Sequence, residues 1–159
     1  MKIIFVHGIH ATRKSATDQL APLVKAYLIE RGHDVEVECH KYGYALALPR
    51  SIGNWANNRR AAALAKRVPT DRPVVVIGHS NGCTIGHILQ KLHRHLAGLV
   101  LFQPALDNDV AFTGTDRVLV IYNERDDVVE GSRLAWFSSW GNMGRVGYKG
   151  PSGNVQQID

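Results

Sequence analysis

The residues best suited to chemistry in this sequence form one short segment, residues 78–82, which reads Gly-His-Ser-Asn-Gly. It follows the strand-like run 73–77, a proline and four β-branched residues, and precedes a stretch with helical hydrophobic spacing, so Ser80 lies at a strand-to-helix turn. Gly78 and Gly82 leave room for the chain to turn sharply on either side of the serine. Such a turn exposes the hydroxyl beside a helix N-terminus, where free N–H groups favour developing negative charge. The pattern predicts a nucleophilic serine.

A G-x-S-x-G motif in this setting resembles the α/β-hydrolase family, and the resemblance covers nearly the whole chain. In that family an early strand ends in a His-Gly pair, and the next residue donates a backbone N–H to the oxyanion hole. The N-terminal run Phe-Val-His-Gly-Ile, residues 5–9, fits this pattern. The resemblance implies an oxyanion hole built from the backbone N–H groups of Ile9 and Asn81. It implies structural roles at the site for His7, Gly8, Gly78 and Gly82.

The same resemblance places the acid of a catalytic triad after a later strand. The strand-like segment 117–122 leads into a polar turn that contains two adjacent aspartates. Matched residue by residue, the family pattern favours Asp126 as the acid, with Asp127 as the alternative. An aspartate in that place holds a histidine in one tautomer and stabilises its charged form. A solvated acidic turn is the plain alternative.

The triad base is missing from its usual place, because none of the eight histidines follows Asp126. A serine hydroxyl is a poor nucleophile without a base to take its proton. Three explanations stay open. The histidine could follow Asp159, in a segment after the last strand; His10 or His40 could have taken over the role; or the chain could be a non-catalytic relative that keeps the scaffold for binding or interaction.

Short apolar runs alternate with amphipathic stretches along the chain, which predicts an α/β fold. We expect a three-layer α/β/α sandwich with a mostly parallel sheet, in a single domain spanning residues 1–159. The connection 103–116 is too short for a cap domain. The spacing of apolar residues in the helix at 81–95 leaves His87 on the opposite face, where we expect it to be exposed. Strands are predicted at 2–6, 34–39, 73–77, 99–102, 117–122 and 154–158, and helices at 15–32, 55–68, 81–95 and 133–140.

The composition is that of an ordinary globular protein, with 45% hydrophobic and 21% charged residues among 159. The net charge is +5, but the basic residues are scattered and form no stripe interleaved with aromatics, so we expect no nucleic-acid partner. No apolar run approaches the roughly 20 residues that span a bilayer, so we expect no membrane insertion. Cys39 and Cys83 show neither metal nor redox spacing, and a reducing cytoplasm is the simplest compartment.

The resemblance implies a small lidless serine esterase or lipase-like enzyme. It would cleave a carboxylic ester, or else a thioester or amide, through an acyl-enzyme on Ser80, and it would need no cofactor. The pair His7-x-x-His10 has no third ligand at a suitable spacing, so no metal is expected. The substrate and the oligomeric state stay open. Candidates for an acyl pocket are Phe102, Leu106, Phe112, Trp136 and Trp140.

Overall fold

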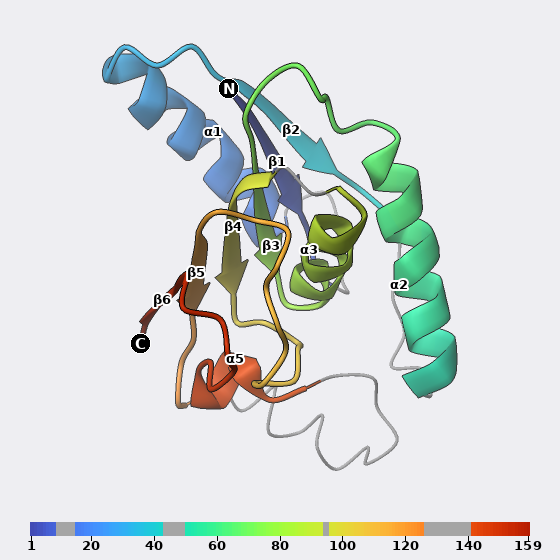
Figure 1. Ribbon diagram of the computed structural model, residues 1–159. Coiled ribbons are helices and arrows are strands. Elements are labelled where there is room, and N and C mark those ends of the chain that lie inside the picture. Colours follow the sequence, from blue (N-terminus) through green and yellow to red (C-terminus); the bar gives the residue numbers. More distant parts are fainter. Residues whose placement is uncertain (9–14, 43–49, 94–95, 126–140) are drawn as a thin grey trace.

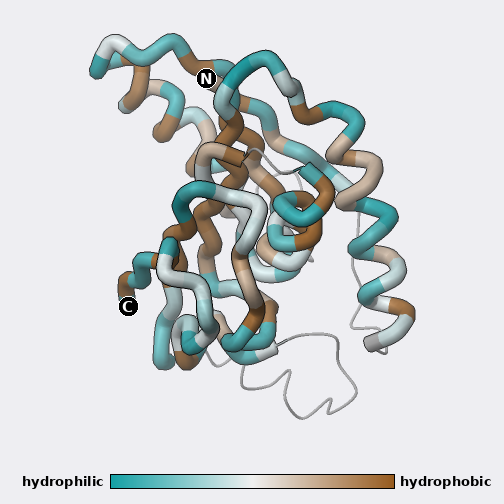
Figure 2. Tube along the Cα trace, in the orientation of Figure 1, coloured by the Kyte–Doolittle hydropathy of each residue, from teal (hydrophilic) through white to brown (hydrophobic). Residues whose placement is uncertain are grey.

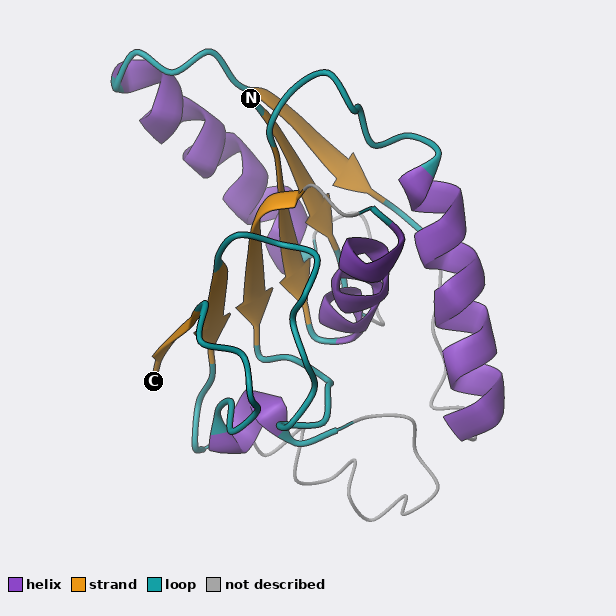
Figure 3. Cartoon of the chain, viewed as in Figure 1, coloured by secondary structure: helices purple, strands orange, loops and turns teal. Residues whose placement is uncertain are grey.

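The computed structural model describes residues 1–8, 15–42, 50–93, 96–125 and 141–159. Within these residues six strands form one sheet in the order β2-β1-β3-β4-β5-β6, and every neighbouring pair is parallel (Figures 1 and 3). The strands are β1 (Lys2–Val6), β2 (Glu36–His40), β3 (Val74–His79), β4 (Leu96–Phe102), β5 (Val118–Ile121) and β6 (Val155–Ile158). The helices are α1 (Ala16–Glu30), α2 (Arg50–Ala65), α3 (Asn81–Leu92) and α5 (Met143–Val146).

The sheet lies between two helical layers, as the sequence predicts. Successive side chains of a strand point to opposite faces. Ile3 and Phe5 of β1 pack with α1, whereas Ile4 and Val6 belong to the larger core that includes α2 and α3. In Figure 2 the hydrophobic residues concentrate along the central strands, and hydrophilic residues run along much of α2. The three-layer α/β architecture is therefore confirmed.

The predicted elements differ from the observed ones mainly at their ends. The strand at Lys2–Val6 has the predicted bounds. Ser15 caps α1 with Asp18 in a reciprocal pair of side chain-to-backbone bonds, both 3.3 Å long, which explains the helix start. The helix ends before Gly32, whose φ of 78° favours glycine. The helix α5 was not predicted, and the helix expected at 133–140 lies outside the described residues.

The expectation that His87 is exposed is wrong. His87 is only 5% exposed, and its ring meets that of Phe112 edge-on at 5.2 Å. The connection between β4 and β5 covers the outer side of α3, where the backbone N–H of Thr113 donates to Gln90 at 3.2 Å. The helix is therefore buried on its polar face as well as on its apolar face, while Leu92 at its end is 54% exposed.

All six strands run in the same direction, so their carboxyl ends lie along one edge of the sheet, the lower edge in Figure 1. In parallel α/β sheets ligands bind along this edge. The connection of residues 103–117 between β4 and β5 is described throughout and holds no inserted domain. None of the described helices is long and apolar enough to cross a membrane.

Candidate active site

Ser80 forms the turn between β3 and α3 at the carboxyl edge of the sheet. Its backbone has φ 52° and ψ −120°, a left-handed conformation that residues with a side chain rarely adopt. The Ser80 N–H donates to the Phe102 carbonyl of β4 at 2.9 Å, and the Ser80 carbonyl accepts from the Cys83 N–H at 3.0 Å. These bonds hold the turn and place the serine at the N-terminus of the 12-residue helix α3.

Gly78 and Gly82 permit two close backbone approaches around this turn. A Cβ on Gly78 would lie 2.8 Å from the Cα of Cys83. A Cβ on Gly82 would overlap the carbonyl oxygen of Val6 and lie 2.6 Å from that of His7. All three obstacles are backbone atoms that cannot rotate away. The first turn of α3 can therefore pack directly on the end of β1 only because residue 82 is glycine.

Gly8 brings the loop after β1 alongside the serine. A Cβ on Gly8 would lie 3.2 Å from the Cβ of Ser80 and 3.0 Å from Nδ1 of His79. The loop that the sequence predicts to carry one oxyanion donor thus begins beside Ser80, while Ile9 itself lies outside the described residues. Asn81 is the first residue of α3, so its backbone N–H has no acceptor within the helix.

His7 is held by both ring nitrogens. Nδ1 hydrogen-bonds the Gly8 carbonyl, and Nε2 accepts the backbone N–H of Tyr42 at 3.1 Å. The ring stacks on Tyr42 with centroids 4.1 Å apart and is only 2% exposed. Burial lowers the pKa of His7, because the charged ring would lose its hydration. The proton therefore sits on Nδ1, and neither nitrogen is left to serve Ser80.

Tyr42 connects the loop after β1 to α3. Its hydroxyl lies 2.9 Å from the His7 carbonyl oxygen and 3.1 Å from that of Gly8, which gives its proton two acceptors. The same hydroxyl accepts from Nδ2 of Asn81 at 3.1 Å. Burial raises the pKa of Tyr42 to about 12, so the hydroxyl keeps its proton at any pH at which the protein would be assayed.

Asn57 of α2 holds the other side of Asn81. Nδ2 of Asn57 donates to Oδ1 of Asn81 at 3.0 Å, and Nδ2 of Asn81 donates to Oδ1 of Asn57 at 3.2 Å. Both side chains are buried, at 3% and 1% exposure. Nη1 of Arg60 donates to Oδ1 of Asn57 at 3.0 Å, and its guanidinium lies 4.8 Å from the Tyr42 ring centroid.

The predicted acid Asp126, its alternative Asp127 and the candidate base His10 lie outside the described residues. His40 ends β2, and β1 separates it from β3. Its Nδ1 accepts from the guanidinium of Arg67 at 3.1 Å, so this nitrogen is not free to donate to the acid of a triad. Within the described part of the chain no side chain hydrogen-bonds the Ser80 hydroxyl. These residues also contain no group of three or more potential metal ligands.

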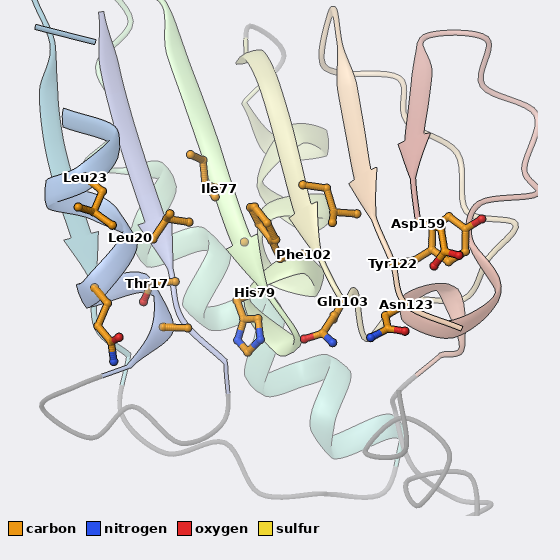
Figure 4. A pocket seen from close by; sticks show the side chains of 14 residues that line it. Thr17, Leu20, Leu23, Ile77, His79, Phe102, Gln103, Tyr122, Asn123 and Asp159 are labelled. Carbon is orange, nitrogen blue, oxygen red and sulfur yellow. The ribbon is translucent and has the colours of Figure 1, made fainter. Parts of the chain in front are cut away.

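A cavity of about 780 Å³ lies beside the elbow on the α1 side of the sheet (Figure 4). Leu20 and Leu23 of α1 face Ile77 and Phe102 across it. Polar side chains such as His79 and Gln103 lie at the end of the cavity nearest the carboxyl ends of the strands. Among the residues predicted for an acyl pocket, Phe102 lines this cavity. Leu106 and Phe112 are instead part of the core on the opposite face, and Trp136 and Trp140 lie outside the described residues.

Three residues at this edge were not predicted from the sequence. Gln103 has φ 45° without being glycine, and its N–H donates to the Ile121 carbonyl at 2.8 Å, which fixes the end of β4 beside β5. Tyr42 and Asn57 come from a polar loop and an alanine-rich helix. Neither segment carries a motif, so no signal in the sequence marks these residues.

No model of a known protein family matches the sequence, and the comparison with curated proteins gave no match. Among solved structures, one similar protein bears the description 'putative hydrolase of the alpha/beta superfamily' and comes from Xanthomonas campestris pv. campestris; it is 17% identical with a TM-score of 0.47 over 99% of this chain and 86% of that one. Another is a dienelactone hydrolase-like promiscuous phosphotriesterase from metagenomic libraries, 14% identical with a TM-score of 0.48 over 98% of this chain and 69% of that one. These sequence identities and TM-scores are too low to assign an activity to this chain. The α/β fold is shown instead by the order and parallel direction of the strands described above.

Proposed function

We propose that this protein is a serine hydrolase of the α/β-hydrolase superfamily, which cleaves a carboxylic ester through an acyl-enzyme on Ser80. The observation that carries the proposal is the backbone of Ser80, with φ 52° and ψ −120° between a buried parallel strand and a helix. A residue with a side chain costs about 1–3 kcal/mol in such a conformation, and strain of this size concentrates at functional sites. Glycine would avoid the strain, so a serine here points to a use for its hydroxyl.

The proposed reaction is acyl transfer. Oγ of Ser80 attacks the carbonyl carbon of the ester, and the carbonyl oxygen becomes an oxyanion near the N-terminus of α3. The backbone N–H of Asn81 stabilises it there, with the N–H of Ile9 as the second donor. Asp126 orients the histidine that takes the Ser80 proton and returns it to the leaving alcohol. Water then releases the acid from the serine.

The proposed reaction uses neither His7 nor His40 as the base, because both ring nitrogens of His7 are hydrogen-bonded elsewhere and Nδ1 of His40 accepts from Arg67. With no inserted domain between β4 and β5, we expect a site open to small ester substrates, with thioesters and amides as the next candidates. A p-nitrophenyl ester of a short acid is therefore the first substrate to try.

A fluorophosphonate probe tests the proposal directly, because it labels only a serine whose hydroxyl is activated. We expect the full-length protein to be labelled and the Ser80→Ala variant to remain unlabelled. Ser51, which is exposed on α2, supplies the matched control, and its replacement by alanine should leave labelling unchanged.

The competing function is a binding protein that keeps the fold but no longer reacts. The sequence feature that favours it is that none of the eight histidines follows Asp126, the predicted acid. Folded wild-type protein that neither reacts with the probe nor hydrolyses the ester would reject the hydrolase and support this second function. Labelling that persists in the Ser80→Ala variant would place the reactive group elsewhere.

A further inference from the structure

The two sides of the proposed oxyanion hole are joined by side chains that lie outside the serine motif. We infer that Tyr42 and Asn57 are positioning residues of this hole: Tyr42 ties the loop after β1 to the first residue of α3, and Asn57 fixes that residue from α2. The inference rests on the proposed function, because the hole has a role only if Ser80 forms an acyl-enzyme.

The Tyr42 hydroxyl reaches both sides of the hole. On one side its neighbours are the carbonyl oxygens of His7 and Gly8, at 2.9 and 3.1 Å, which belong to the two residues directly before Ile9. On the other side it accepts from the Asn81 carboxamide at 3.1 Å. The backbone N–H of Tyr42 also bonds the His7 ring at 3.1 Å, so a single residue holds the loop at two points.

Asn57 fixes the orientation of Asn81 rather than its position alone. Two reciprocal amide hydrogen bonds of 3.0 and 3.2 Å join the two side chains, which leaves the Asn81 side chain little freedom to rotate. The side chain and the backbone N–H of Asn81 share one Cα, so this pair also constrains the direction in which that N–H points. Arg60 occupies the remaining lone-pair direction of the Asn57 oxygen at 3.0 Å.

Asn57 and Asn81 are buried, and Tyr42 is partly buried beside them. Buried amides and hydroxyls are tolerated only when their hydrogen bonds are satisfied, and here each bond also sets the geometry of a different chain segment. An oxyanion donor works only within about 2.7–3.1 Å of the developing charge. A shift of a few tenths of an ångström between the loop and α3 would therefore weaken catalysis without removing any group that contacts the substrate.

Tyr42→Phe is the sharpest test, because it removes one hydroxyl and keeps the ring that stacks on His7. In the full-length protein we expect kcat for a p-nitrophenyl ester to fall by about tenfold or more, with KM unchanged within about twofold. The loss should be smaller than the 10²–10³-fold measured when an oxyanion donor itself is removed. Tyr148→Phe is the matched control: that hydroxyl accepts the Ser152 N–H at 2.7 Å within the connection between α5 and β6, and kcat should not change.

Asn57→Ala provides a second variant that acts from a different element. It should lower kcat at constant KM in the same way, and the double variant should lose less than the product of the two single losses, because both act on one hole. A carboxylic ester that the wild type binds but hydrolyses slowly, used as a competitive inhibitor, should retain its affinity in both variants. A purely structural defect would change binding and turnover together.

The outcomes separate the two proposals. If the wild type shows Ser80-dependent turnover and a folded Tyr42→Phe variant keeps the wild-type kcat, the positioning role is overturned and the hydrolase stands. A rise in KM at constant kcat also overturns it, because Tyr42 would then contact substrate. If the wild type shows no turnover and no labelling, the hydrolase fails and the positioning role fails with it. If Tyr42→Phe does not fold, Asn57→Ala decides by the same criteria.

Discussion

The strain at Ser80 predicts an unusual order of stability among variants at this position. Ser80→Ala keeps a Cβ and therefore keeps the strain of a φ of 52°. Ser80→Gly removes the Cβ, and glycine populates positive φ as readily as negative φ. Glycine normally destabilises a protein relative to alanine. Here we expect the Ser80→Gly variant to be the more stable of the two.

The size of the difference follows from two opposing contributions. Relief of the strain contributes about 1–3 kcal/mol in favour of glycine. The greater freedom of glycine in the unfolded chain costs about 0.4–1 kcal/mol. The Ser80→Gly variant should therefore exceed Ser80→Ala by about 1 kcal/mol in its free energy of unfolding, or roughly 2–4 °C in Tm for a chain of this size.

Urea denaturation and thermal melts of the two variants measure this difference, and both variants are inactive under the proposed mechanism. Ala62 lies on the exposed side of α2 and supplies the control. There the change from alanine to glycine should lower stability by about 1 kcal/mol, the ordinary helix value. If glycine at position 80 proves as destabilising as it is at position 62, the elbow is not strained and the main support for a catalytic Ser80 is lost.

Two further predictions concern the neighbours of the elbow. In Gly82→Ala the new Cβ would overlap the carbonyl oxygens of Val6 and His7, so the free energy of unfolding should fall by ~1–3 kcal/mol or more, as in an overpacked core, and fluorophosphonate labelling should be lost. Gly98→Ala is the control, because its Cβ would meet Val75 side-chain atoms at 3.6 Å and the Arg117 carbonyl oxygen at 3.9 Å, which are ordinary contacts. This variant should behave as wild type. Burial lowers the pKa of His87 from 6.5 to about 4, so the folded state binds fewer protons than the unfolded state between these values. The contribution of neutral His87 to the free energy of unfolding should be complete above pH 6.5 and fall by about 3 kcal/mol as the pH drops to 4. In urea denaturation at pH 7 and pH 4.5 the His87→Leu variant should lose less stability than wild type, and an equal loss in both would contradict the assignment.

Most of the fold could be predicted because its signals are local. Strands buried on both faces of a parallel sheet are short apolar runs. Such runs therefore predict both ends of β1 correctly and the ends of β3 to within a few residues. Ser15 and Gly32 mark the ends of α1 by capping chemistry that depends only on neighbouring residues. The serine turn was predictable for the same reason, since the glycines that permit it lie two residues away on either side.

The prediction for His87 failed because helix periodicity identifies the apolar face and leaves open what covers the other one. The sequence places His87 opposite the apolar stripe of α3, and that geometry is correct. The connection between β4 and β5 then folds over this face and brings Phe112 against the ring. Whether a polar face meets water or another segment depends on chain paths far from the helix itself.

The sequence by itself determined the parallel α/β architecture and the serine turn, because sterics and periodicity act over a few residues. Only the tertiary structure decided what surrounds that turn. Tyr42 and Asn81 are 39 residues apart, yet their side chains are hydrogen-bonded because β1, β3 and α3 converge at one edge of the sheet. Asn57 joins them from α2. Hydrogen bonds between distant segments leave no periodic trace in the sequence, since each depends on the packing of the whole domain.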